Sequence, residues 1–333
     1  MMTREFQPTI SHETKRKVRA KRFFIVAGSI LRAFILIGLC FVILLPIFEK
    51  LSSALRHPTD IANSQVVFIP ATFSFINFRV AAEMLYYTEA LANTFILSTI
   101  TMVIQIIATA IAGYAFARLK FKGSNVIFLI ILCTLVVPNE ALDRSRAWFL
   151  LEHPFLGINL VGNIFSMYIL AAFGQGIRSA IFIYLFRQFF RGIPKELEES
   201  AEVDGAGVFR TFWSVMLPNA RGAIVTVGLF AFVWQWNDCY FGQLLGYTSG
   251  NMTLLAVQLS TGTEGLRTII GTWTAAGNPV LESFMTSGVV TDPQFVSLIA
   301  NTAALMIMAP LLIGYFFVQR LFVESIERTG ITG

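Results

Sequence analysis

Charged residues are scarce in this chain of 333 residues, because Asp, Glu, Lys and Arg together supply only 14% of it. A soluble globular domain carries about 25% charged and about 45–50% apolar residues, whereas 55% of the residues here are apolar. This deficit of charge argues against a water-soluble domain and favours a chain that lies in lipid. The net charge of +5 does not indicate a nucleic-acid partner, since the basic residues stand beside apolar runs.

Cysteine and histidine are equally sparse. The chain has three of each, which are Cys40, Cys133, Cys239, His12, His57 and His153. The cysteines lie in or beside apolar stretches without metal-ligand spacing, which disfavours a disulfide framework or a zinc site. No nucleophile or base accompanies the histidines, so a membrane protease or transferase is disfavoured. The sequence therefore predicts no catalytic residue, no metal site and no bound cofactor.

A bilayer-spanning helix needs about 20 mostly apolar residues, and six apolar stretches reach or approach this length. They cover residues 24–48, 91–117, 125–137, 160–186, 222–236 and 295–318. The third is short but can extend through Pro138. None of the six shows the alternation that is typical of a membrane β-barrel. The first ends in bulky residues without a cleavage site and is interpreted as an uncleaved span. The predicted fold is all-α, a polytopic membrane protein with about six transmembrane helices.

Lys and Arg concentrate on the cytoplasmic side of bacterial inner membranes. Basic residues gather in the N-terminal tail, after the second stretch, between the fourth and fifth, and after the sixth. Both termini and the loop 187–221 are therefore predicted to be cytoplasmic, and the loops 49–90, 139–157 and 240–294 face the other side. The stretches contain no Asp or Glu in their interiors, which argues against a proton-coupled secondary transporter.

A helix–turn–helix is predicted on the cytoplasmic face over residues 193–218. Pro194 suits the first helical turn, Gly205 and Gly207 supply a turn, and Pro218 ends the second helix. Three glutamates complement the positive N-terminal end of the first helix, namely Glu196, Glu198 and Glu199. Helical spacing predicts one apolar face on the second helix, made by Phe209, Phe212, Trp213 and Met216. On pattern alone, a hairpin that rests on the membrane surface is an equal alternative.

This segment resembles the EAA loop of ABC importer permeases. Glu199-Ser200-Ala201 matches Glu-Ala-Ala with Ser in place of the first Ala, Gly205 matches the later Gly, and Leu217-Pro218 closes the pattern. Further matches occur in the same order as in the family, at Ala92-Asn93-Thr94, residues 113–118, residues 186–190, Trp236-Asn237-Asp238 and Gln319-Arg320. The resemblance covers residues 92–320 and is strongest to the carbohydrate branch, in particular to the second permease of maltose transporters. Residues 263–287 look like an insertion, and residues 324–333 match only loosely.

The resemblance implies a permease subunit of a bacterial ABC importer in the inner membrane, which forms the pathway for a sugar or sugar derivative. A non-sugar solute remains an alternative. The implied partners are a cytoplasmic ATPase dimer that binds the ATP, a second permease subunit in a heterodimer, a periplasmic or lipoprotein solute-binding protein, and membrane lipids. The implied ATPase-coupling residues are Glu198, Glu199, Ser200, Ala201, Asp204, Gly205, Ala206, Leu217 and Pro218, with Glu199 opposite a basic ATPase group.

Four regions follow from these patterns. They are a basic cytoplasmic tail (1–22), a first transmembrane helix with its periplasmic loop (23–90), a permease core (91–320) and a cytoplasmic C-terminal tail (321–333). Within the core, Gln175 and Arg178 are predicted to line the translocation pathway. Arg178 lies nine residues before Arg187, deep in the hydrocarbon, and a helix would place both side chains on one face. A kink at the neighbouring glycines, with Arg178 extended toward the headgroups, is the alternative.

Overall fold

The computed structural model describes residues 12–58, 60, 69–142, 145–146, 159–247, 252–277 and 293–330. Over this part of the chain the regular structure is helical, and the one β pairing is an isolated bridge between Arg56 and Phe73. The prediction of an all-α fold is therefore confirmed.

Three helices are long and apolar enough to cross a membrane: α1 (His12–Leu55), α3 (Tyr87–Arg118) and α15 (Pro293–Gly330). They contain the predicted first, second and sixth spans. α1 begins within the predicted N-terminal tail, and α15 continues into the predicted C-terminal tail. Both helices extend past their apolar stretches because Lys, Arg and Glu are good helix formers.

The other predicted spans are shorter or broken. α4 (Ser124–Cys133) has ten residues and is about 15 Å long, half the thickness of the hydrocarbon. The continuous helix predicted over residues 160–186 is wrong, because α6 (Phe165–Ala172) and α7 (Ser179–Gly192) are separate. α11 (Arg221–Trp236) forms a bent pair with the helical segment before it. The described residues thus contain three helices that are each long and apolar enough to cross a membrane, or four if the bent pair forms one span. The total of six spans remains a prediction.

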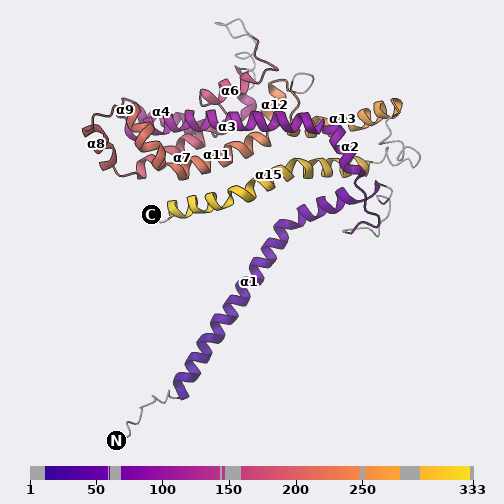
Figure 1. The fold of residues 1–333 in the computed structure, drawn as a ribbon, viewed down its shortest axis with the longest axis horizontal. Helices are drawn as coiled ribbons and strands as arrows, with labels where there is room; N and C mark the ends of the chain where they lie inside the picture. Colours follow the sequence, from indigo (N-terminus) through magenta and orange to yellow (C-terminus); the bar gives the residue numbers. More distant parts are fainter. Residues whose placement is uncertain are drawn as a thin grey trace.

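A compact bundle of α3, α7 and α11 forms the centre of the molecule (Figure 1). α3 packs so closely on α7 that a Cβ atom added at Gly113 would lie 2.5 Å from the Cβ of Phe186. The core of this bundle is rich in buried aromatic rings, including Phe182, Phe186, Phe190 and Phe212. The close approach of the two backbones explains why the chain has glycine at position 113.

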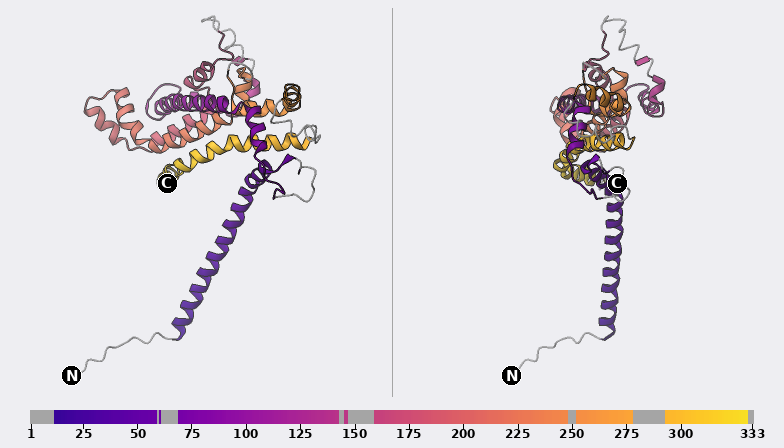
Figure 2. Two further views of the ribbon diagram at one scale, coloured as in Figure 1. Left: turned by 45° about the vertical axis from the view of Figure 1, so that its right-hand side comes forward. Right: turned by 90° about the vertical axis from the view of Figure 1, so that its right-hand side faces the viewer.

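α15 lies beside α11, and the C-terminal part of α1 contacts α15, where the Nζ of Lys50 donates to the Oδ1 of Asn301 at 2.7 Å. The rest of α1 projects away from the bundle (Figures 1 and 2). Its apolar side chains, such as Phe34 and Ile37, are exposed in the isolated chain. This surface requires lipid or another membrane subunit to cover it, since water does not solvate such a stretch well.

The two ends of the bundle carry different short helices (Figure 1). At one end lie α8 (Glu196–Val203), α9 (Val208–Thr211), a π-helical turn η3 (Phe212–Met216) and α10 (Leu217–Asn219). Toward the other end lie α2 (Ile76–Leu85), α12 (Tyr240–Leu244) and α13 (Leu255–Ala275), and a 3₁₀ turn covers Asn139–Leu142. α13 includes the first part of the predicted insertion at 263–287, whereas residues 278–287 lie outside the described residues.

Candidate functional site

Two helices joined by a tight turn occupy the segment that was predicted to be a helix–turn–helix. α8 ends at a turn where Gly205 has a φ of +77°, and α9 begins three residues later. The N–H groups of Gly205 and Ala206 donate to the carbonyls of Glu202 and Ala201 at 3.0 and 2.9 Å. Branched residues adopt this left-handed backbone poorly, so the turn requires glycine.

Polar contacts attach this hairpin to the end of α3. The Nε of Arg118 lies 3.3 Å from the Oε2 of Glu198, and the hydroxyl of Tyr114 donates to the Oε1 of Glu198 at 2.8 Å. The guanidinium of Arg118 also donates to the carbonyl of Ile193. Because the side chains of Arg118 and Glu198 are only 7% and 16% exposed, this ion pair is largely shielded from water. Tyr114 and Arg118 were part of a family-like motif in the sequence, but no role was predicted for them.

The next glutamate along α8 has different surroundings. Glu199 is exposed, and no hydrogen bond or ion pair holds its carboxylate in the described part of the chain. Ser200, Asp204 and Gly205 are also exposed, whereas Ala201 is buried against the bundle. Glu198 therefore faces inward, toward α3, whereas Glu199 is on the surface of the hairpin.

The predicted single apolar face on the second helix of the hairpin is wrong. Phe212 and Met216 are buried in the core, while Phe209 and Trp213 are 75% and 52% exposed. The π-helical turn η3 widens the spacing, so residues with α-helical spacing point in two directions. The exposed pair leaves an aromatic surface on the hairpin.

Leu217 and Pro218 lie in the short α10, and the helix ends at Asn219, one residue later than predicted. The segment Val208–Asn219 meets α11 at an angle of 79°. Only Ala220 separates α10 from α11, so the bend lies directly between the hairpin and α11.

A groove of about 790 Å³ lies between the hairpin and the ends of α3 and α7. Its lining includes basic and acidic side chains, among them Lys120, Lys122, Arg191, Lys195, Glu199 and Glu202. The hairpin therefore lies beside a groove that carries charged side chains of both signs.

A second site lies where the predicted fourth span is interrupted. The chain leaves the helical path between α6 and α7, with a φ of +71° at Gly174 and +53° at Arg178. The side-chain amide of Gln105 on α3 stabilises this break by donating to the carbonyl of Ile177 and to the Oγ of Ser179, both at 2.8 Å. Gln105 is almost fully buried, so these bonds satisfy polar groups that lie inside the bundle.

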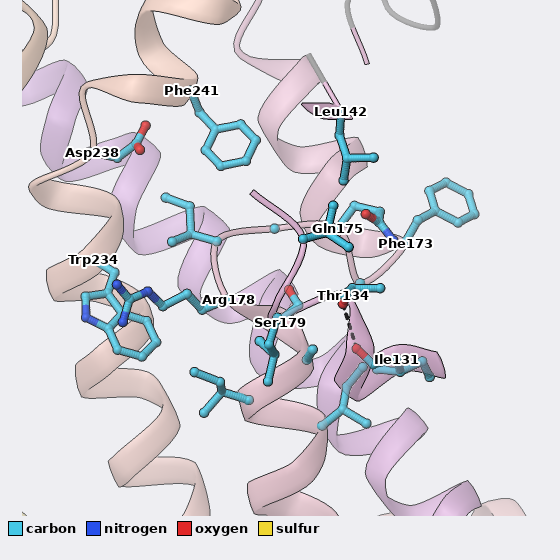
Figure 3. Close-up of a pocket in the computed structure, with 18 of the residues that line it drawn as sticks. Ile131, Thr134, Leu142, Phe173, Gln175, Arg178, Ser179, Trp234, Asp238 and Phe241 are labelled. Carbon is cyan, nitrogen blue, oxygen red and sulfur yellow. Dashed lines mark hydrogen bonds between the residues drawn. The ribbon is translucent and has the colours of Figure 1, made fainter. Parts of the chain in front are cut away.

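The break opens into a cavity of about 1040 Å³ that both predicted pathway residues line. Gln175 and Arg178 do not share a helix face as predicted, because both lie in the break. Figure 3 shows Arg178 directed toward Trp234, while Gln175 points to the other side, near Phe173. The guanidinium carbon of Arg178 lies 4.7 Å from the centroid of the Trp234 ring, a distance typical of a cation–π contact.

Further along the lining, Asp238 lies two residues before the short helix α12. Its Oδ2 accepts the backbone N–H of Gly242 at 3.2 Å, and burial raises the pKa of its carboxyl to about 6. Arg146 lies with its guanidinium 5.1 Å from the ring centroid of Phe241. Trp234, Asp238 and Phe241 were not predicted as site residues, although the Trp-Asn-Asp motif marked their neighbourhood.

Among the described residues, no three His, Cys, Asp or Glu side chains gather in a way that could hold a metal ion. The two candidate sites are a hairpin with an exposed carboxylate at one end of the bundle and a cavity within the bundle whose lining includes charged side chains.

Comparison with known proteins gives a consistent picture. Residues 105–328 match the family described as binding-protein-dependent transport system inner membrane component. The maltodextrin transport system permease protein MalD of Streptococcus pneumoniae is 30% identical over 302 residues, which cover 90% of this chain and 93% of that protein. The arabinooligosaccharides transport system permease protein AraQ of Halalkalibacterium halodurans is 26% identical over 298 residues, 89% of this chain and 93% of the relative.

A solved structure has the same fold. It is the crystal structure of a bacterial ABC transporter involved in the import of the acidic polysaccharide alginate, with a TM-score of 0.64 and 21% identity over 95% of this chain and all of that one. The family match covers the cavity-lining break, the hairpin and most of α15. This chain therefore belongs to the family of inner-membrane components of binding-protein-dependent transport systems, as a multi-pass permease subunit of an ABC importer.

Proposed function

We propose that this chain forms one half of the translocation pathway for a saccharide, driven by an ATPase that is a separate subunit. The support for a saccharide comes from the relatives, whose names specify transport of maltodextrin and of arabinooligosaccharides. A solute-binding protein delivers the substrate, and a second, different permease subunit completes the pathway. The exposed apolar length of α1 offers a surface for that subunit and for lipid.

The hairpin is the proposed docking element for the ATPase, and the two adjacent glutamates are the observation that carries this role. Glu198 is committed to Arg118 and Tyr114 within the subunit, while Glu199 is exposed and free of partners within the described residues. Because the contacts of Glu198 hold α8 against α3, the exposed carboxylate of Glu199 on the same helix is well placed to meet a basic group of the ATPase. The other exposed coupling residues, Ser200, Asp204 and Gly205, lie on or beside the same helix.

Orientation follows from the charge distribution. We place the hairpin and both termini in the cytoplasm of a bacterial cell and α2, α12 and α13 on the outer side of its inner membrane, in agreement with the bias of Lys and Arg. The two groups of short helices lie toward opposite ends of the bundle (Figure 1), which supports this assignment. The outer group is then available to a solute-binding protein.

Two substitutions test the docking role. Glu199→Lys reverses the exposed carboxylate, and losing one partner of a close charge pair at an interface costs about 2–5 kcal/mol. Gly205→Val places a branched residue in a left-handed turn. The expected strain comes from the backbone conformation, because no atom lies within 4 Å of the added Cβ. We expect both variants to insert normally and to lose co-purification with a tagged ATPase, or substrate uptake, by at least about tenfold.

Glu89→Lys is the matched control, because Glu89 is an exposed carboxylate at the opposite end of α3. It should keep both ATPase association and uptake. A hairpin that merely rests on lipid would predict a mild effect of Glu199→Lys, since added positive charge favours anionic headgroups. Full ATPase association and full uptake in both hairpin variants would contradict the proposed docking role.

A further inference from the structure

We propose that the cavity at the break between α6 and α7 binds the anionic group of an acidic saccharide, and that Arg178 recognises this group. The proposal rests on the proposed saccharide import and adds the chemical class of the substrate. The cavity is about 1040 Å³, slightly above the range of about 300–1,000 Å³ that is usual for ligand sites. It has room for at least one sugar ring and its substituents.

The guanidinium of Arg178 is oriented but not neutralised. The Arg178 side chain is exposed, and its guanidinium carbon lies 4.7 Å from the centroid of the Trp234 ring. Neither a hydrogen bond nor an ion pair occupies its N–H groups in the part of the chain that the structure describes. These donors have the planar spacing that matches the two oxygens of a carboxylate.

The backbone adds positive potential at the same place. Arg178 is the residue directly before α7, and no side chain caps the N-terminus of this helix. The first residues of α7, Ser179 and Ala180, line the cavity. The N-terminal end of a 14-residue helix carries a partial positive charge. Interrupted membrane helices that direct such an end at an anionic substrate group are a recurrent arrangement in transporters.

The described lining also carries a carboxylate, Asp238, whose Oδ2 accepts the N–H of Gly242. No ion pair joins Asp238 to Arg178 among the contacts of the described residues. The carboxylate of Asp238 therefore leaves the charge of Arg178 available to an anionic ligand.

The remainder of the lining suits a sugar. Gln175 is exposed at the cavity and offers an amide that both donates to and accepts from hydroxyl groups. Phe173 and Tyr240 add aromatic residues to the same lining. A hydroxyl-rich ligand with a carboxylate uses all of these features, whereas a neutral saccharide leaves the charge of Arg178 unused.

Binding of two matched sugars tests this inference. The transporter is purified through a tag on this chain as the assembled complex, placed in lipid nanodiscs and titrated with tetragalacturonate or maltotetraose while tryptophan fluorescence is recorded. We expect the acidic sugar to bind at least about tenfold more tightly, and its affinity to fall as ionic strength rises because salt screens the attraction. Arg178→Gln should reduce the affinity for tetragalacturonate at least about tenfold and leave that for maltotetraose within about twofold.

Arg178→Lys keeps the charge without the planar fork and should retain intermediate affinity for the acid. Arg79→Gln, at an exposed arginine of α2 outside the cavity, should change nothing. Equal affinity for the two sugars, absence of binding, or unchanged affinity in Arg178→Gln would overturn the inference. The proposed importer function is judged separately, by ATPase co-purification and uptake, and so survives any of these results.

Discussion

Glu198 and Glu199 are neighbours in α8, but their carboxylates have opposite surroundings. Glu198 contacts Arg118 and Tyr114 of α3, whereas Glu199 is exposed. A helix turns by about 100° per residue, so adjacent side chains necessarily point in different directions. One carboxylate can therefore hold the hairpin in place while the next remains available to a partner.

This difference predicts distinct effects of two alanine substitutions. Glu198→Ala leaves a nearly buried Arg118 without its carboxylate, which costs about 1–3 kcal/mol. We expect the amide hydrogens of α8 to exchange at least about fivefold faster, because the local opening of the hairpin becomes easier. Glu199→Ala, as the matched control, should leave this exchange unchanged.

Hydrogen exchange measured by mass spectrometry on the purified protein in nanodiscs reports both variants. Exchange in α3 provides an internal reference, since its central residues pack in the bundle core. Equal exchange in α8 of Glu198→Ala and the parent protein would show that the contacts with Arg118 and Tyr114 do not hold the hairpin.

At the scale of elements, the packing of α3 on α7 depends on a glycine. A Cβ atom at position 113 would lie 2.5 Å from the Cβ of Phe186 and 3.0 Å from the backbone nitrogen of Arg187. Neither atom is the end of a flexible side chain, so the helices themselves would have to separate. Gly113→Ala should destabilise the protein by about 1–3 kcal/mol, as is typical of overpacking.

Gly38→Ala in α1 is the control, because no atom lies within 4 Å of the added Cβ. Helix propensity alone favours alanine over glycine by about 1 kcal/mol, so this variant should be neutral or slightly more stable. Thermal unfolding in detergent, followed by size-exclusion chromatography, measures both. A melting temperature for Gly113→Ala equal to that for Gly38→Ala would contradict the close packing of α3 and α7.

At the scale of the whole molecule, α3 separates two regions that should lie on opposite sides of the membrane. With 32 residues it is about 48 Å long, which exceeds the hydrocarbon thickness of about 30 Å. Ile69 lies before α2 and is 77% exposed, and Lys122 lies just after α3 and is also exposed. The orientation proposed from the Lys and Arg bias places Ile69 outside and Lys122 in the cytoplasm.

Single cysteines at these positions, in a background without Cys40, Cys133 and Cys239, test the orientation. An impermeant maleimide added to intact spheroplasts should label Ile69→Cys, and should label Lys122→Cys only after lysis. The reverse pattern would show that the protein has the opposite orientation.

The amino-acid sequence by itself determined the class of the protein and its helical fold. Shortage of charge and long apolar stretches leave helices as the way to satisfy backbone hydrogen bonds in lipid, and the motif around Glu199 and Gly205 indicated the family that the comparisons confirm. These properties depend on composition and local spacing. The first, second and sixth predicted spans are therefore found in the structure, within α1, α3 and α15.

Tertiary structure decided where the helices break and which side chains meet. The fourth stretch is apolar enough to be one helix, yet it is interrupted because Gln105, 72 residues earlier than Ile177, bonds to the backbone of the break. The contact of Glu198 with Arg118 and that of Arg178 with Trp234 likewise join distant parts of the chain. Local patterns carry no information on such pairings, because their energies arise only after the helices have packed.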